Sequence, residues 1–165
     1  MLIVAPSGSE KLESERETPI SSIARNETGS VAALERVKAS GARQSIISAL
    51  RQDLLEEITT RLGVAKYMDR ICGVDNLDGF GKIDRAKELI SDLQPPQTSQ
   101  TSQTPQTFVL IGDSLHDKEV ADALGARCVL CGQGSHAVWR LRAVAPTGET
   151  LLDALDIALG GKDSA

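Results

Sequence analysis

The apolar residues of this chain form short continuous runs, separated by longer segments with helical periodicity. The clearest run is Phe108–Ile111, which lacks polar alternation and therefore predicts a strand buried on both faces. Gly112 allows a sharp turn after it, and Lys118–Leu124 then has helical character. That segment ends at Gly125, a residue that favours a helix C-terminus. We therefore predict a buried strand, a turn and a helix in this part of the chain.

Other segments repeat this alternation of strands and helices. Apolar runs predict strands at residues 2–5, 44–48 and 127–131, a return toward the sheet within 64–73, and helices at 30–39, 51–62, 83–93 and 147–159. Strands that alternate with helices are typical of a parallel sheet. The pattern predicts an α/β fold, a Rossmann-like three-layer sandwich with a mostly parallel sheet.

Polar segments set the expected domain organisation. The 165 residues suffice for one ordinary domain with a hydrophobic core, which we place at residues 30–159. Before it, residues 1–9 are expected to form a short strand and turn, and residues 10–29 a polar linker. Residues 94–107 are a low-complexity run of Gln, Thr, Ser and Pro, which predicts a surface loop. Residues 160–165 are expected to be a polar tail.

Composition narrows the classes of partner. The net charge is −5 and aromatic residues make up only 2% of the chain, so neither an electrostatic footprint for nucleic acid nor a base-stacking platform is visible. No apolar run approaches the length of a membrane span, so no membrane partner is expected. Three cysteines have no framework spacing, and we interpret Cys128 and Cys131 as part of a buried strand. An intracellular, cytoplasmic location is the expectation.

Polar residues at three predicted strand or helix ends carry the candidate chemistry. Asp113 and Asp117 lie at a strand-to-helix corner, where paired carboxylates are suited to a hard cation such as Mg²⁺. Ser48 ends another strand, and Lys82 begins a helix after a glycine loop. Each residue also has a purely structural interpretation, as a helix cap or a surface charge. A hydroxyl, an ammonium and two carboxylates at one sheet edge would together suit a phosphoryl group.

These residues resemble motifs of the haloacid dehalogenase superfamily, nearest its phosphoglycolate-phosphatase-like branch. Ile46–Ser48 resembles motif II, Lys82 in Gly-Lys-Ile-Asp resembles motif III, and Gly112–Asp117 resembles motif IV. The resemblance covers roughly Ser30 to Leu159. It implies a Mg²⁺-dependent phosphatase that hydrolyses small phosphate monoesters through an aspartyl-phosphate. Motifs II and III would hold the phosphate, and motif IV would help to hold Mg²⁺.

A glycine-rich segment follows the last long predicted strand. Gly132–Ala137 matches G-x-G-x-x-A, the form of a dinucleotide fingerprint, but it follows the last long strand rather than the first. We interpret it as a loop at the ligand edge of the sheet. Gly134 and His136 resemble a Gly-His segment of the same family branch, and we regard them as a weaker prediction of a substrate loop.

The chain departs from this family at its N-terminus. The family's first motif, D-x-D-G-T after a strand, supplies the nucleophile, whereas this chain has no aspartate before Asp53. In the nearest alignment, Ala5 stands at the nucleophile position and Ser7 at the second aspartate, and neither replaces a carboxylate well. We predict that Leu2–Ala5 fills the central slot of the sheet, and that the inserted cap domain is missing. Three possibilities follow: an impaired phosphatase, a non-catalytic phosphate-binding or regulatory pseudo-phosphatase, or a truncated gene product.

Overall fold

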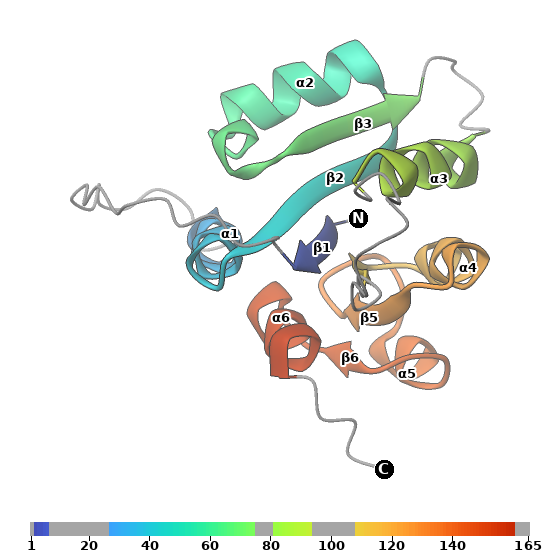
Figure 1. The fold of residues 1–165 in the computed structure, drawn as a ribbon. Coiled ribbons are helices and arrows are strands. Elements are labelled where there is room, and N and C mark those ends of the chain that lie inside the picture. Colours follow the sequence, from blue (N-terminus) through green and yellow to red (C-terminus); the bar gives the residue numbers. More distant parts are fainter. Residues whose placement is uncertain (1, 7–26, 75–80, 94–107, 161–165) are drawn as a thin grey trace, which may run out of the picture.

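The fold is known from a computed structural model that describes residues 2–6, 27–74, 81–93 and 108–160. Within these residues a six-stranded sheet forms the centre, with the strand order β3-β2-β1-β4-β5-β6 (Figure 1). The strands are β1 (Leu2–Pro6), β2 (Ala42–Arg51), β3 (Arg70–Val74), β4 (Val109–Gly112), β5 (Arg127–Cys131) and β6 (Thr147–Gly148). All pairs that exclude β1 are parallel, which confirms the predicted Rossmann-like, mostly parallel sheet.

Helices cover both faces of the sheet and complete the three-layer sandwich. On one face, α1 (Glu27–Ala39) and α6 (Leu151–Gly160) bury Val109, Ile111 and Val129. On the other, α3 (Lys82–Leu93) and α4 (Leu115–Leu124) bury Ile47, Leu110 and Leu130. The remaining helical elements are α2 (Gln52–Arg61), the short η1 (Ala65–Tyr67) and α5 (Val138–Arg142). Successive residues of β4 and β5 thus point into opposite layers, as expected for strands buried on both faces.

Strand β1 occupies the centre of the sheet, as the sequence predicted, but it runs against its neighbours. It is antiparallel to both β2 and β4, with Leu2 opposite Ile46 and Ile111. Ala5 lies opposite Arg43, near the start of β2 and therefore at the amino edge of the sheet. The expected placement of Ala5 at the nucleophile position is wrong, because that position requires a strand ending at the carboxyl edge. Ser7 lies outside the described residues.

Several predicted boundaries also need correction. Residues 27–29 belong to α1 rather than to a linker, and α5 was not predicted. Thr147 and Gly148 form the edge strand β6 and do not begin the last helix, which starts at Leu151. A Cβ at Gly148 would lie 2.2 Å from the amide nitrogen of Ala154, so close packing of α6 requires glycine there. The loop predicted at 94–107 lies outside the described residues.

The two cysteines of β5 face opposite layers. Cys128 packs into the cluster beneath α3 and α4, and Cys131 packs into the cluster beneath α1 and α6. Burial raises the pKa of both thiols, that of Cys128 to about 11. Both are therefore core residues, as predicted, and their side chains cannot be joined across the strand. None of the described helices combines the length and apolar character that a membrane span requires.

Candidate active site

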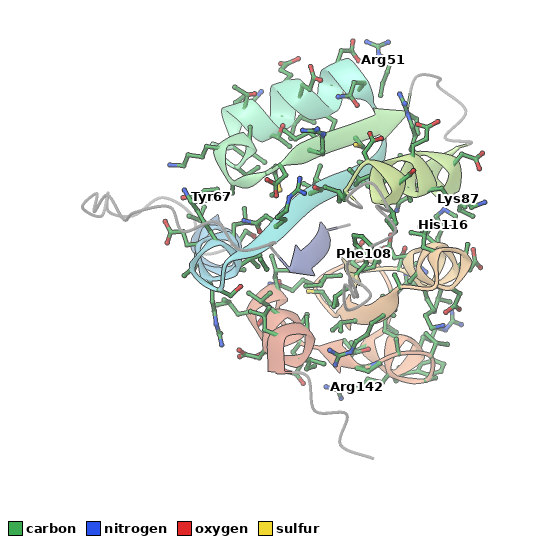
Figure 2. All side chains as sticks on the ribbon, in the orientation of Figure 1. Arg51, Tyr67, Lys87, Phe108, His116 and Arg142 are labelled. Carbon is green, nitrogen blue, oxygen red and sulfur yellow. The ribbon has the colours of Figure 1, made fainter. Side chains whose placement is uncertain are left out.

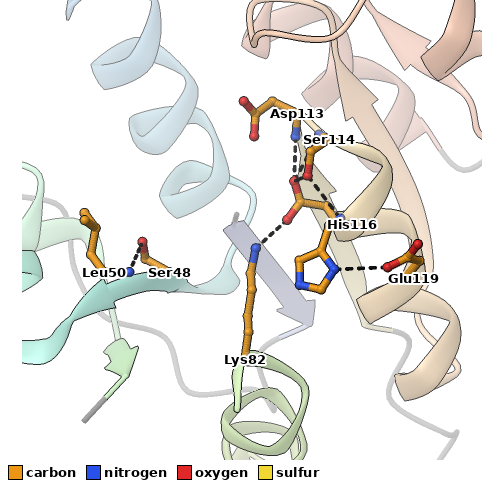
Figure 3. Close-up of polar contacts among 8 residues, drawn as sticks. Ser48, Leu50, Lys82, Asp113, Ser114, His116 and Glu119 are labelled. Carbon is orange, nitrogen blue, oxygen red and sulfur yellow. Dashed lines mark hydrogen bonds and ion pairs between the residues drawn. The ribbon is translucent and has the colours of Figure 1, made fainter. Parts of the chain in front are cut away.

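The site centres on a buried ion pair between α3 and α4. Lys82, the first residue of α3, places Nζ 2.7 Å from Oδ1 of Asp117 (Figure 3). The side chains are 11% and 2% exposed, respectively. Desolvated charges are stable only with a close partner, so the pair holds each group in one position. This contact joins two of the predicted site residues, which lie 35 positions apart in the sequence.

Asp117 is also the organising residue of the corner between β4 and α4. Its Oδ2 accepts hydrogen bonds from the amides of Asp113 and Ser114, at 3.0 and 3.1 Å, and from Oγ of Ser114 at 2.8 Å. Oγ of Ser114 in turn accepts the amide of Asp117, which completes a capping box at the start of α4. Gly112 is required here, because a Cβ on it would lie 2.3 Å from Cβ of Asp117.

These contacts fix the charge of Asp117. Burial alone would raise its pKa, but the hydrogen bond and charge of Lys82, together with the Ser114 hydroxyl, lower the pKa to about 2. Asp117 is therefore an anion throughout the physiological pH range. It is suited to orienting Lys82, whose ammonium has three donors and gives one of them to this carboxylate.

Asp113 differs from Asp117 in being exposed at the carboxyl edge of the sheet. The Gly132–Ala137 loop closes against it, since a Cβ on Gly134 would lie 2.3 Å from Oδ2 of Asp113. His136 belongs to the same loop, and its Nδ1 is buried with no hydrogen-bond partner in the described part of the chain. The structure thus brings the predicted Gly134 loop to Asp113, and it shows why residue 134 has no room for a side chain.

Ser48 lies at the same edge of the sheet as Asp113, on β2, which is separated from β4 by the central strand β1. It follows Ile47, after which the pairing of β2 with β3 becomes irregular. Its Oγ accepts a hydrogen bond from the amide of Leu50 at 3.1 Å, which shapes the end of the strand. Figure 3 shows Ser48 on the other side of Lys82 from Asp113. Ser48, Lys82 and Asp113 therefore lie at the same edge of the sheet, and both the Lys82 ammonium and the Asp113 amide contact Asp117.

Metal binding depends on which carboxylate oxygens are free. Among the described residues, no cluster of three His, Cys, Asp or Glu side chains suits a metal ion. Asp117 uses Oδ2 for three hydrogen bonds and Oδ1 for Lys82, so it does not fit a direct ligand in this arrangement. Asp113 does fit, because Mg²⁺ is often held by one or two carboxylates together with substrate phosphates and water.

Ser114 is the residue that sequence reasoning missed. It supplies the N-cap of α4 and hydrogen bonds to the Asp117 carboxylate. The signal was present, since Ser114 and Asp117 have the Ser-x-x-Asp spacing of a capping box. The capping box predicts that the Asp117 carboxylate caps the start of the helix, which leaves the Asp113 carboxylate as the one available to a metal ion.

Comparisons with known proteins identify the family and support the fold. The model of the haloacid dehalogenase-like hydrolase family matches residues 15–131, more than half of the chain. Among solved structures, a predicted phosphatase from Clostridium acetobutylicum is similar, with 19% identity and a TM-score of 0.66. Protein Tyrosine Kinase A (PtkA) from Mycobacterium tuberculosis is also similar, with 22% identity and a TM-score of 0.61. Each match covers 80% of this chain and 59% of the other, and at these identities it supports the fold alone. No curated protein matched.

Proposed function

Because this chain belongs to the family of haloacid dehalogenase-like hydrolases, we propose that its sheet edge is a phosphatase-type site for small phosphate monoesters. The observation that supports this most is Lys82. Its ammonium is nearly buried, held by a charged partner, and still has two donors for a ligand. Burying a lysine costs desolvation free energy, and a buried ion pair contributes little net stability in return. A role in ligand binding therefore explains the position of Lys82 better than a role in stability.

We assign the roles from the position of each group. The Ser48 hydroxyl and the Lys82 ammonium bind oxygens of the phosphoryl group, while Asp117 orients Lys82. Asp113 holds Mg²⁺, which when bound neutralises charge that develops on the phosphoryl oxygens. Gly134 allows the neighbouring loop to lie close to the Asp113 carboxylate.

Hydrolysis is expected to be impaired. In this mechanism a carboxylate must attack phosphorus from the central strand, between Ser48 and Asp113. The strand found there, β1, has the sequence Leu-Ile-Val-Ala-Pro and runs in the opposite direction. It contributes no nucleophile to the carboxyl edge, and nucleophilic catalysis depends on that group. A phosphate-binding or regulatory module is therefore the second candidate, because it needs the cradle without the nucleophile.

The test is vanadate binding with and without Mg²⁺, together with hydrolysis of p-nitrophenyl phosphate. Lys82→Met should weaken vanadate binding about tenfold to a hundredfold, because one charged hydrogen bond is lost. Lys87→Met is the matched control on the same helix, since the Lys87 side chain is 59% exposed and its ion pair among the described residues is a long one, 4.0 Å to Asp84. Circular dichroism would verify that both variants are folded.

The results distinguish the candidates. Binding that requires Lys82, with hydrolysis indistinguishable from background, would support the binding module. Binding with Mg²⁺-dependent turnover would support the phosphatase and would place the nucleophile elsewhere. Equal vanadate affinity in wild-type protein, Lys82→Met and Lys87→Met would reject both.

A further inference from the structure

Helix α2 presents a ridge of aliphatic side chains at the β3 end of the sheet. The helix packs against β2, β3 and η1. Leu54, Ile58 and Leu62 follow one another at intervals of four residues, the spacing of a ridge along one side of a helix. Leu54 is 41% exposed and Leu62 is 53% exposed, while Ile58 between them is half-buried. Figure 2 shows Arg51, which precedes α2, and Arg142 at opposite ends of the molecule, so the ridge lies toward one outer end.

The two flanks of this ridge differ in burial. Successive residues of a helix are about 100° apart around its axis, which places Leu55 and Thr59 on one flank of Ile58 and Glu57 and Arg61 on the other. Leu55 and Thr59 are buried in the protein, whereas Glu57 and Arg61 are exposed. Across the described parts of the chain, neither of these two charged side chains forms an ion pair. Single exposed leucines are common on protein surfaces, but an aliphatic ridge beside unpaired opposite charges indicates a contact surface.

The exposed side of α2 is complementary to itself. A twofold contact places residue i of one copy against residue j of the other, and j against i. If two α2 helices meet antiparallel at Ile58, Leu54 of each copy meets Leu62 of the other, because both leucines lie four residues from Ile58. The twofold axis also brings like flanks together, so Glu57 of each copy lies beside Arg61 of the other, about 3 Å apart along the axis. A parallel pair would instead place this charged flank against the buried one.

We propose that α2 is a dimer interface, and that its partner is α2 of a second copy of this chain, antiparallel about Ile58. The aliphatic ridge supplies the apolar contact, and two Glu57–Arg61 ion pairs between the copies fix the direction of the helices. Antiparallel helix dipoles favour the same arrangement. A helix of ten residues is only about 15 Å long, so the interface is small and the dimer is reversible, with a population that depends on protein concentration. This proposal does not depend on the function assigned to Lys82 and Asp113.

Sedimentation velocity of the full chain would detect the dimer. We expect the average mass to rise from monomer toward dimer as the protein concentration increases from roughly 10 µM to 1 mM. Leu54→Gln removes apolar contact at both ends of the ridge and should weaken association about tenfold or more. Leu159→Gln is the matched control, because Leu159 is a leucine on α6 that is 37% exposed. A wild-type chain that stays monomeric over this range, or a Leu54→Gln variant that associates as well as Leu159→Gln, would overturn the proposal.

Two charge reversals test the direction of the helices. Glu57→Arg and Arg61→Glu each replace both ion pairs with contacts between like charges, so each variant alone should associate at least about tenfold more weakly than wild-type protein. Both side chains are exposed, and circular dichroism would verify that the variants are folded.

An equimolar mixture of the two variants provides the decisive comparison. Each arginine on the flank of one chain then faces a glutamate of the other, so opposite charges meet again across the interface. We expect the mixture to dimerise as wild-type protein does at the same total concentration, while each separate variant remains largely monomeric. A mixture that associates no better than the separate variants would overturn the antiparallel contact.

Discussion

Asp117 is held as an anion by its neighbours, and this links the stability of the protein to pH. Its pKa is about 2 in the folded protein, against 3.8 for an unperturbed carboxyl group. A lowered pKa stabilises the folded state above pH 3.8, and the contribution is lost as the pH falls from 3.8 toward 2. The difference amounts to about 2 kcal/mol. Urea unfolding between pH 5 and pH 2, in steps, would measure the loss.

Lys82→Met provides the comparison for this prediction. Other carboxylates contribute to acid unfolding in both proteins, so the informative quantity is the difference between the two pH profiles. Without Lys82 the largest lowering influence on the Asp117 pKa is gone. The variant should therefore be less stable at neutral pH, by about 3 kcal/mol for a broken buried pair. It should also lose less stability on acidification. Parallel profiles would show that the pair does not set the pKa.

Ser45 is a buried residue whose hydroxyl forms no stabilising hydrogen bond with the described residues. It is 1% exposed in β2, and its Oγ has no hydrogen-bond partner among the residues that the structure describes. Replacing an unsatisfied buried hydroxyl removes a desolvation cost, so Ser45→Ala should raise the free energy of unfolding by about 1 kcal/mol. Chemical denaturation would measure the change. A decrease in stability would indicate that the hydroxyl has a partner, such as ordered water.

At the level of elements, the same substitution should have the opposite effect at the start of α4. The Ser114 hydroxyl accepts the Asp117 amide and donates to its carboxylate. Ser114→Ala removes both contacts, so we expect a loss of about 1–2 kcal/mol, the usual cost of an N-cap. Measuring Ser45→Ala and Ser114→Ala together controls for the chemistry of the change, because only the surroundings differ. Equal effects of the two substitutions would contradict the capping assignment.

The elements differ in how well the sequence predicts them. Strand β4 and helix α4 follow from local signals: an apolar run, Gly112, the charged first turn and Gly125. Strand β6 does not, because its two residues become a strand only by pairing with β5. The sequence predicts that Lys82 and Asp117 lie at the same edge of the sheet, but it does not predict the ion pair between them. Local sequence patterns carry no information on which distant side chains meet. The sequence also does not predict the direction in which a strand runs, because its side chains alternate between the two faces of the sheet in either direction.

The direction of β1 has a consequence for the whole molecule. Because Ala5 lies at the amino edge, opposite Arg43, a carboxylate there cannot reach a ligand held by Lys82. Ala5→Asp should therefore leave hydrolysis of p-nitrophenyl phosphate unchanged, with or without Mg²⁺. Wild-type protein assayed in parallel is the control. Activity gained in Ala5→Asp would require β1 to run parallel to β2, and would return Ala5 to the nucleophile position.

Strand β1 also decides whether the sheet is continuous. It is the strand that joins the β3-β2 half to the β4-β5-β6 half, and it pairs with both. Backbone amides paired on both sides of a central strand open only when much of the sheet opens. We therefore expect the amides of Ile3 and Val4 to exchange with deuterium as slowly as those of Leu110 and Val129, and much more slowly than the exposed Ser135. Exchange of Ile3 and Val4 at the rate of Ser135 would mean that β2 and β4 lack a stable partner between them.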